Sequence, residues 1–441
     1  MRILFLPIDN RPVCYSLPKD IIDIDSSLNI ELPPRELLGD LHKSADTKKL
    51  FEWIKNVPEC DVIILSLDTI AYGGLIPSRR SEETYETIKT KLLSLKEVLK
   101  SKSAKILAFS SIMRISNNNY NEEEKEYWKD FGKKIFEYSF SGGKNLSDIP
   151  NEIIEDYLAT RKRNFEINKL YLEWQKEGLF ETLIFSKDDC AESGFNVNEA
   201  KELEKMGATI KTGADEIPLS LLARAIQKNI NVYVEYTEPN HKHLISNYED
   251  ISIENTVLGQ LELCGFNVVQ EKSLADIVLI VNNFRNKQGE LVMDWETTQY
   301  SDEFVPPEQN YAIADVRNAN GADNNFIDQA LKKLDLENFY GYAAWNTSAN
   351  TIGSLLAIIK VKYNAKNYNE NSFKKLQMIR FLDDWAYQAN VRKQINKPCD
   401  ISERIKEYEK KLIPILKPEL TRTISYSFPW ERTFEIEVNI G

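Results

Sequence analysis

Acidic side chains recur directly after short apolar runs of this chain, where they are placed to act as acids, bases or ligands. Asp68 and Asp215 each end such a run, Glu216 follows Asp215, and Asp188 and Asp189 end another run together. Cleavage of a glycosidic bond needs two carboxyl groups, one protonated and one ionised, about 5–5.5 Å apart for retention or roughly 6.5–9.5 Å apart for inversion. These five residues are therefore the candidate catalytic groups.

Arginine, asparagine and aromatic side chains accompany these carboxylates and suit the binding of a polyhydroxylated ligand. Amide and guanidinium groups hydrogen-bond hydroxyls, an indole ring such as that of Trp345 offers a stacking face, and the Gly73-Gly74 pair lets backbone approach a ligand closely. The candidate substrate-binding residues are Asp9, Arg11, Tyr72, Arg79, Arg114, Lys187, Asn320, Asp323, Trp345, Asn346 and Asn350.

Some of these residues have a second interpretation. Successive side chains of an extended strand point to opposite faces, so only one of Asp188 and Asp189 can face a site, and the other would support it. Asn346 and Asn350 precede a helix that we expect to start near Thr351, so they can cap that helix instead of binding a ligand.

Strands of a parallel sheet must position the carboxylates. The apolar runs are continuous, which is typical of strands buried on both faces, and ligands of parallel α/β sheets bind beyond the carboxyl ends of such strands. We expect the first half to be an α/β fold, either a (β/α) barrel-like fold or an open parallel sheet. Its expected strands cover 2–9, 61–68, 104–111, 182–189 and 208–215, with helices over 87–100 and 197–207.

A second β-α-β series begins near residue 226 and predicts a Rossmann-like or flavodoxin-like layer. Its expected strands cover 232–238, 267–270, 275–283, 311–317 and 339–346, and its helices cover 254–264, 325–334, 350–362 and 372–390. A helix near 402–411 and a terminal hairpin within 421–440 follow. We therefore expect a (β/α) domain over 1–225 with most strand-end carboxylates, a Rossmann-like domain over 226–365 and a C-terminal extension over 366–441.

Two charged segments fit neither series of strands. The segment 117–180 is rich in charged and aromatic residues, and we interpret it as a solvated helical excursion, with a substrate lid as the alternative. The segment 380–392 predicts an amphipathic helix whose Asp383 and Asp384 form surface or interdomain salt bridges.

Composition excludes several classes of partner. Lys plus Arg total 56 against 68 Asp plus Glu, a net charge of −12 without a basic block, so we expect no nucleic-acid partner. The sequence contains no run of about 18 apolar residues, so we expect no membrane span, and the apolar start of the chain is too short for a secretory signal. The five cysteines are widely separated and form no CxxC pair, which fits a reducing cytoplasm. We therefore expect a cytoplasmic protein.

Motifs along nearly the whole chain carry a family resemblance. They are IDNRP (8–12), ELPP (31–34), LLG (37–39), SLDTIAYGGLIPSR (66–79), KDD (187–189), GADE (213–216), NANGAD (318–323) and WNTSANTIG (345–353). In them the chain resembles a bacterial family known as domain of unknown function 4127, with the YGGL step and the WNT…NT…G loop as the most specific parts. The resemblance implies no established reaction.

Three classes of function fit these residues. Paired carboxylates, Asn and Arg donors and 7 Trp, 20 Tyr and 19 Phe favour a carbohydrate-active enzyme, first of all a glycoside hydrolase with a small-molecule or oligosaccharide substrate. No nucleotide-binding fingerprint predicts a cofactor, but oxygen ligands suit hard cations. The alternatives are a hydrolase or transferase with a divalent cation on Asp9, Asp68, Asp188 and Asp215, and a cytoplasmic sugar-binding protein without catalysis.

Overall fold

The chain folds into two compact units that share its sequence in alternating segments. The computed structural model describes residues 1–145, 148–188, 190–226, 228–395 and 401–441. Unit 1 comprises Met1–Tyr15, Ile30–Pro218 and Tyr248–Asp250, and unit 2 comprises Ser16–Asn29, Leu219–Asn247 and Ile251–Gly441. Residues 366–441, expected as an extension, lie within unit 2, together with residues 16–29 from near the start of the chain.

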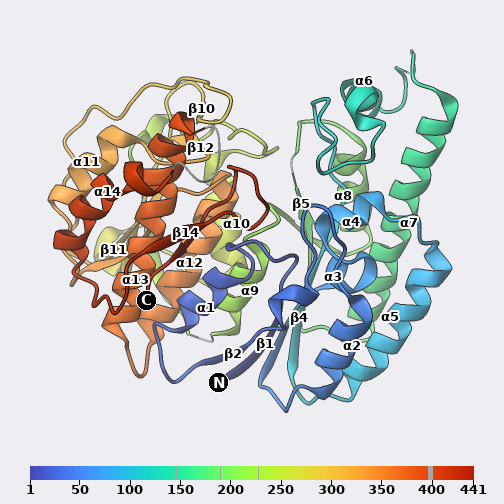
Figure 1. The fold of residues 1–441 in the computed structure, drawn as a ribbon, viewed down its shortest axis with the longest axis horizontal. Helices are drawn as coiled ribbons and strands as arrows, with labels where there is room; N and C mark the ends of the chain where they lie inside the picture. Colours follow the sequence, from blue (N-terminus) through green and yellow to red (C-terminus); the bar gives the residue numbers. More distant parts are fainter. Residues whose placement is uncertain (146–147, 189, 227, 396–400) are drawn as a thin grey trace. The chain divides into compact units, whose positions relative to one another are not determined.

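The sheet of unit 1 has six strands in the order β2-β1-β3-β4-β5-β6 (Figure 1). The pairs β1–β3, β3–β4, β4–β5 and β5–β6 are parallel. The sheet is open, so of the two predicted alternatives the open sheet is found and the barrel is not. The strands are β1 (Arg2–Leu6), β2 (Asn29–Glu31), β3 (Val62–Ser66), β4 (Lys105–Ile112), β5 (Thr182–Lys187) and β6 (Thr209–Thr212).

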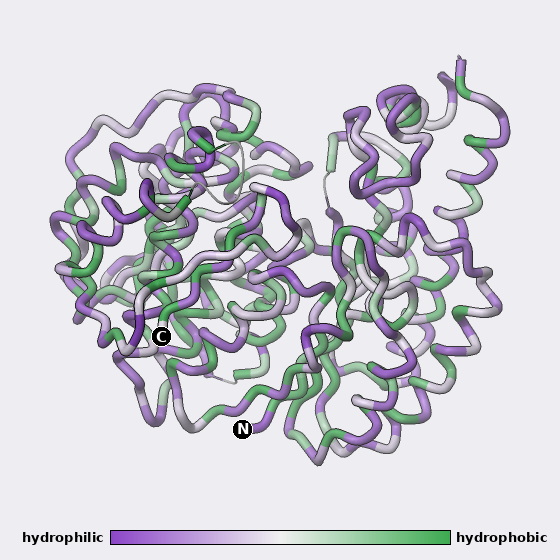
Figure 2. Tube along the Cα trace, viewed as in Figure 1, coloured by the Kyte–Doolittle hydropathy of each residue, from purple (hydrophilic) through white to green (hydrophobic). Residues whose placement is uncertain are grey.

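Helices cover the strands of unit 1 because continuous apolar strands need cover on both faces. All five residues of β3 are buried, and in β4 only Lys105 is exposed. The central strands β3 and β4 are accordingly mostly green in Figure 2, whereas the helices alternate between green and purple. The helices are η1 (Arg35–Leu37), α2 (Thr47–Asn56), α3 (Leu67–Tyr72), α4 (Leu75–Arg80), α5 (Tyr85–Lys100), α6 (Trp128–Phe140), α7 (Asn151–Lys176) and α8 (Phe195–Lys205).

The charged segment 117–180 forms α6 and α7. It is helical as expected, but part of it is buried, which the interpretation as a solvated excursion did not include. Trp128, Ile135 and Tyr157 are buried in a small core of their own, to which both helices contribute. Farther along α7, Tyr171 and Trp174 are buried in the main core of unit 1. Aromatic side chains thus supply enough apolar surface to fix helices that look hydrophilic in sequence.

The sheet of unit 2 has five strands in the order β13-β11-β9-β7-β8, and all of its neighbouring pairs are parallel. Counted along the chain this order is 2-1-3-4-5, which is the flavodoxin-like order and also the order of the first five strands of unit 1. The strands are β7 (Asn231–Tyr236), β8 (Asn267–Val268), β9 (Ile277–Asn282), β11 (Tyr311–Asp315) and β13 (Phe339–Ala343). The predicted flavodoxin-like layer is therefore present.

Helices and two small sheets complete unit 2. The pair β10 (Gly289–Glu290) and β12 (Asn318–Ala319) is parallel, and β14 (Ser425–Ser427) and β15 (Glu437–Asn439) form the predicted antiparallel terminal pair. The helices are α1 (Ser16–Ile22), α9 (Ile217–Ala225), η2 (Pro239–His241), α10 (Ile253–Leu263), η3 (Lys272–Leu274), α11 (Asn324–Lys332), α12 (Ser348–Asn364), α13 (Glu370–Arg380), η4 (Phe381–Val391), η5 (Arg392–Gln394) and α14 (Ile401–Leu416). Among the described residues no helix has the length and apolar character needed to cross a membrane.

The segment 16–29 is tied to the later part of unit 2 by backbone contacts. The Asp25 carboxylate accepts hydrogen bonds from the N–H groups of Lys366 and Asn367, each at 3.0 Å. The N–H of Asn369 donates to the carbonyl of Ile24 at 2.8 Å. A short N-terminal segment therefore becomes part of the C-terminal core.

The helix expected over 372–390 consists of α13 and the π-helix η4, and the expected surface position of its acidic pair is wrong. Asp384 is fully buried and Asp383 is 8% exposed. Asp384 pairs with Arg380 at 2.6 Å and accepts the N–H of Ala344 at 2.6 Å. The carboxylate is buried because it satisfies a backbone donor directly after β13, which an apolar side chain cannot do.

Candidate functional site

Arg11 joins the loop after β1 to the loop after β6. Its backbone N–H donates to Asp9 Oδ1 at 3.0 Å, and its Nε donates to Asp9 Oδ2 at 2.9 Å. Its two terminal nitrogens donate to the two oxygens of Asp215 at 3.0 and 2.6 Å, a bidentate pair. All three residues are at most 7% exposed. One guanidinium therefore fixes two carboxylates that the chain separates by more than 200 residues.

The electrostatics of this group favour partial protonation. Burial raises the pKa of Asp215 to about 6, with Arg11 opposing the rise and Asp9 and Asp188 contributing to it. A carboxyl group with this pKa still holds its proton in part of the molecules near neutral pH, whereas an ordinary aspartate does not. Asp215 therefore has the protonation behaviour of a general acid.

Cys14 lies beside the two carboxylates, and the three side chains form a possible metal-ligand set. The ligand atoms of Asp9, Cys14 and Asp215 lie within 4.8 Å of one another. Burial, with Asp9 and Asp215, raises the pKa of Cys14 well above its ordinary value, which keeps the thiol protonated. Arg11 already binds both carboxylates. The donor set therefore fits a guanidinium better than a divalent cation.

Asp188 directly follows β5 and has a carboxylate oxygen that is not used in hydrogen bonding. Its Oδ2 is buried and makes no hydrogen bond to any residue that the structure describes. This oxygen faces Nη1 of Arg114 at 3.6 Å, beyond hydrogen-bond distance, and the side chain is 17% exposed. Asp188 is therefore a carboxylate with a lone pair left for a ligand. Asp189, predicted beside it, lies outside the described residues.

Arg79 and Arg114 share two glutamates that the sequence interpretation did not select. Arg114 pairs with Glu123 at 2.8 Å and Glu124 at 3.1 Å, and Arg79 pairs with Glu124 at 3.2 Å and Glu123 at 3.4 Å. Arg79 is almost completely buried. The available sequence signal was the acidic run 122–124 in a polar loop, since two strand-end arginines need counter-charges.

Lys187, the last residue of β5, pairs with Asp250 from the short segment that returns to unit 1. Asp250 also accepts the hydroxyl of Thr212 at 3.2 Å. No local pattern marks Asp250, because its two partners precede it by 63 and 38 residues. The ion pair leaves Lys187 less available to a ligand than the sequence indicated.

Asp68 and Tyr72 lie on α3, apart from the Arg11 group in their bonding. Asp68 is 1% exposed and accepts the N–H of Ser111 at 2.8 Å, with the Ser110 hydroxyl at 3.2 Å. Burial raises the pKa of Asp68 to about 6, against the hydrogen bonds from Ser111 and Ser110. The Tyr72 hydroxyl is buried and makes no hydrogen bond within the described part of the chain. The contacts of Asp68 thus hold α3 against β4.

Glu216 is folded back onto its own loop. It is fully buried, accepts the N–H of Ala214 at 3.1 Å, and burial raises its pKa well above the ordinary value. A Cβ at Gly213, where φ is +108°, would lie 1.8 Å from Glu216 Oε1. Glycine at position 213 is therefore required by the buried carboxyl, and the glycines Gly73 and Gly74 likewise approach backbone of unit 1.

The remaining predicted binding residues belong to unit 2. Asp323 is buried and caps α11 through the N–H of Asn325 at 3.0 Å. Asn320 and Asn346 have left-handed backbones, with φ of 61° and 60°, and the N–H of Asn320 donates to the carbonyl of Asn346 at 2.8 Å. Asn350 Nδ2 donates to Thr347 at 3.1 Å. Trp345 is only 5% exposed, which leaves little of it for stacking.

Of the predicted residues, the structure thus brings together Asp9, Arg11 and Asp215 by direct contact, and Asp188 through its electrostatic effect on Asp215. Arg114 and Arg79 extend this group through Glu123 and Glu124. We call Asp9, Arg11, Cys14, Asp188 and Asp215 the Arg11 cluster. Cys14 was not selected in the sequence, although it follows Arg11 by a single helical turn.

Comparisons with known proteins agree with the motif resemblance. No curated protein and no solved structure gives a significant match to the chain. A family model described as "Protein of unknown function (DUF4127)" matches residues 3–439, nearly the whole sequence. The match spans both units and all members of the Arg11 cluster, and so the chain belongs to the DUF4127 family.

Proposed function

We propose that the Arg11 cluster hydrolyses a glycosidic bond, with Asp215 as the acid and Asp188 as the nucleophile or base. The observation that carries the proposal is the contrast between these two carboxyl groups. Burial raises the pKa of Asp215 to about 6, whereas Asp188 keeps a carboxylate oxygen without a hydrogen bond among the described residues. Two nearby carboxyl groups in different environments are the usual basis for assigning one acid and one base or nucleophile.

The proposed reaction gives each residue a separate task. Asp215 donates its proton to the glycosidic oxygen as the bond to the anomeric carbon breaks. Asp188 either attacks that carbon or removes a proton from the water that does, and the hydroxyl of water ends on the anomeric carbon. Arg11 keeps Asp215 and Asp9 in place, and Arg114 orients Asp188. The four described cysteines are free, which supports a reducing, cytoplasmic setting.

The test is turnover of a panel of 4-nitrophenyl glycosides by the full chain and by Asp215→Asn and Asp188→Asn. We expect each variant to lose roughly 10²–10⁴-fold in kcat/KM, the usual contribution of a general acid or base. In the wild type, kcat/KM falls as the pH rises through about 6, because the pKa of Asp215 lies there and the acid must be protonated.

Asp46→Asn is the matched control, since Asp46 is a partly exposed cap of α2 and asparagine caps a helix equally well. It should leave turnover unchanged. Full activity in both Asp215→Asn and Asp188→Asn would refute the assignment of roles, and no turnover of any glycoside in the panel would refute the substrate class.

A metal-dependent hydrolase is the second candidate, and the close approach of Asp9, Cys14 and Asp215 is the observation in its favour. It predicts a divalent cation bound by the purified protein and turnover that stops after chelation. Asp9→Asn and Cys14→Ser would then both release the metal, whereas the acid–base proposal predicts that turnover survives chelation.

A further inference from the structure

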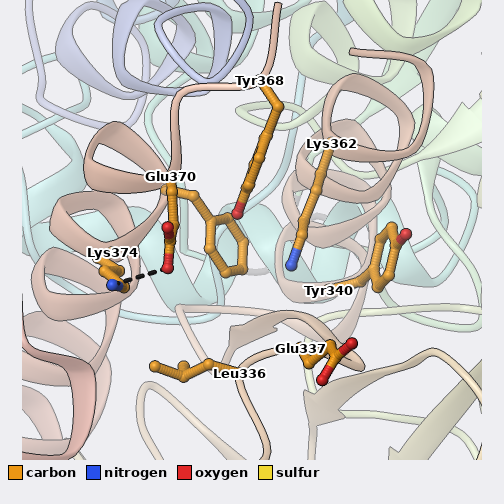
Figure 3. A pocket seen from close by; sticks show the side chains of 8 residues that line it. Leu336, Glu337, Tyr340, Lys362, Tyr368, Glu370 and Lys374 are labelled. Atoms are coloured by element: carbon orange, nitrogen blue, oxygen red, sulfur yellow. Dashed lines mark ion pairs between the residues drawn. The ribbon is translucent and has the colours of Figure 1, made fainter.

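Unit 2 contains a cavity that has no part in the proposed hydrolysis. It has a volume of about 420 Å³ and is lined by residues of β13, α12, α13 and the loops next to them. Three aromatic side chains, Tyr340, Tyr368 and Phe373, form much of its wall, and Lys362 supplies an amino group (Figure 3). A cavity of this size falls within the range of sites for small organic ligands.

The amino group of Lys362 is held at a fixed position among the rings. Its Nζ lies 3.9 Å from the centre of the Phe373 ring, 4.6 Å from that of Tyr340 and 5.6 Å from that of Tyr368. It donates one hydrogen bond, to the carbonyl of Phe339 at 2.6 Å. Figure 3 shows this amino group between Tyr340 and Tyr368, directed to the interior of the cavity.

Burial makes this lysine unusually easy to deprotonate. Burial lowers the pKa of Lys362 to about 8, with Glu370 opposing the change. An ordinary lysine has a pKa near 10.4, so only a trace of it is the neutral amine at pH 8. About half of Lys362 is then neutral, and the neutral amine is the nucleophile that adds to carbonyl groups.

The charges around the cavity do not favour a simple anion site. Glu370 pairs with Lys374 at 2.8 Å, and Glu337 also lines the cavity. The two lysines are therefore matched by two glutamates, and an anionic ligand finds no net positive charge. A neutral ligand with a ring to stack on the aromatic wall and a carbonyl group to meet the amine fits better.

Lys360 is an internal comparison on the same helix. Burial lowers its pKa to about 8 as well, and its Nζ donates to the carbonyl of Gly265 at 2.8 Å over the ring of Phe266. Lys360 does not line this cavity. The two lysines thus share their acidity and differ in access to an aromatic-walled space.

We propose that this cavity binds a small aromatic aldehyde and that Lys362 joins it covalently as an imine. The amine nitrogen bonds to the aldehyde carbon, the carbonyl oxygen leaves as water after taking up two protons from the amine, and no oxidant or reductant is consumed. The rings of Tyr340 and Tyr368, whose centres lie 4.6 and 5.6 Å from the amine, flank the position that the imine occupies.

The experiment uses the full-length protein with 4-hydroxybenzaldehyde and sodium cyanoborohydride at pH 8, which converts an imine into a stable secondary amine. Mass spectrometry of the intact chain and of its peptides locates the label. We expect saturable incorporation of one label at Lys362, at an aldehyde concentration where acetaldehyde, which lacks a ring, gives no selective label.

Three variants separate the contribution of the cavity from that of the amine's acidity. Lys362→Arg should abolish the selective label, and Lys360→Arg should leave it intact. Phe373→Leu removes one aromatic wall but keeps the amine, and it should raise the aldehyde concentration needed for half-maximal labelling severalfold. Labelling that is spread over many lysines, or equal rates at Lys360 and Lys362 in the wild type, would overturn the proposal without depending on any variant's folding. Neither result bears on the Arg11 cluster, which lies in unit 1.

Discussion

Each of the two sheets has an aspartate and, two residues later, an arginine at the carboxyl end of a strand, and the two pairs are used differently. In unit 1 the pair is Asp9 and Arg11, and the guanidinium continues to Asp215. In unit 2 the two residues are Asp315 and Arg317, and the guanidinium pairs with Asp323 at 3.2 Å and with Glu238 at 3.4 Å. The local sequence pattern and the partner type are therefore the same, and the comparison isolates the surroundings.

The surroundings are closed in unit 2. The Arg317 side chain is completely buried and donates to Asn282 at 3.1 Å and to the carbonyl of Thr298 at 2.9 Å. The two oxygens of Asp315 accept from Asn282 and from the N–H of Asp323, each at 2.8 Å. This network joins the ends of β9 and β11 to the start of α11, so its polar groups are used to hold the fold.

The Arg11 cluster differs because some of its polar groups are not used to hold the fold. The raised pKa of Asp215 leaves it partly protonated near neutral pH, and Asp188 keeps an oxygen that makes no hydrogen bond in the described chain. The comparison teaches that an Asp-x-Arg pair after a strand does not by itself mark a reactive site. The distinguishing feature is a neighbouring carboxylate that the fold leaves unbonded.

Replacing Arg317 or Arg11 should give the largest difference in the free energy of unfolding between the two networks. Arg317→Met leaves Asp323 buried without its counter-charge, and we expect a loss of about 3–5 kcal/mol in the free energy of unfolding. Arg11→Met should cost less, because Asp215 with its raised pKa of about 6 takes up a proton readily. Urea unfolding measures both losses, and hydrogen exchange read by mass spectrometry locates them. Equal losses in the two variants would contradict the comparison.

Asp315 and Asp215 should each make the free energy of unfolding depend on pH, and this dependence should extend to a higher pH for Asp315 than for Asp215. Burial and Asp323 raise the pKa of Asp315 to about 8, and burial raises the pKa of Asp215 to about 6. An unfolded aspartate has a pKa near 3.9, so each group stabilises the fold fully below that pH and the stabilisation is lost as the pH rises to the folded value. The slope approaches about 1.4 kcal/mol per pH unit for each group.

Urea unfolding at several pH values tests this difference with Asp315→Asn and Asp215→Asn. Between pH 6 and 8 the stability of Asp315→Asn should fall less steeply than that of the wild type, because the titrating group is gone. Asp215→Asn should run parallel to the wild type above about pH 7, where Asp215 has already lost most of its proton. A flat wild-type profile there, or identical slopes in all three proteins, would show that Asp315 does not hold its proton.

The smallest expected stability effect is at Asp188. Because its Oδ2 has no hydrogen bond in the described chain, Asp188→Asn should change the free energy of unfolding by no more than about 0.5 kcal/mol. The same variant should lose most of its turnover if the proposed function is right. A large loss of stability would instead assign Asp188 a structural task like that of Asp323.

The sequence was sufficient for most strands and most helices, but not for the edge strand β2 or the short pair β10 and β12. Continuous apolar runs predict buried parallel strands, and all ten expected strands occur in the two sheets. It was not sufficient for α6 and α7, whose buried aromatic residues are spaced too widely among charges to reveal a core. It also misplaced Asp383 and Asp384, because burial of a carboxylate depends on a backbone donor that comes from another strand.

The candidate site could be predicted as a list of strand-end residues but not as a group. The rule that ligands bind at the carboxyl edge of a parallel sheet selects Asp9, Arg11, Asp188 and Asp215. It selects Asp68 and Glu216 equally, and only the folded chain shows that their oxygens bind nearby backbone N–H groups. The pairings with Glu124 and Asp250 depend on loops whose return paths no local pattern encodes.

The exchange of segments between the units has a consequence for how the protein is made. The α1 segment carries Leu17, Ile21 and Ile22, which are buried in the finished fold, and its anchor Asp25 bonds to backbone 341 residues further along. Synthesis proceeds at about 5–20 residues per second, so this apolar segment waits on the order of tens of seconds for its partners. Unit 1 likewise lacks Asp250 until all six strands of its sheet have been synthesised. Neither unit can therefore finish folding on the ribosome before the other has been started.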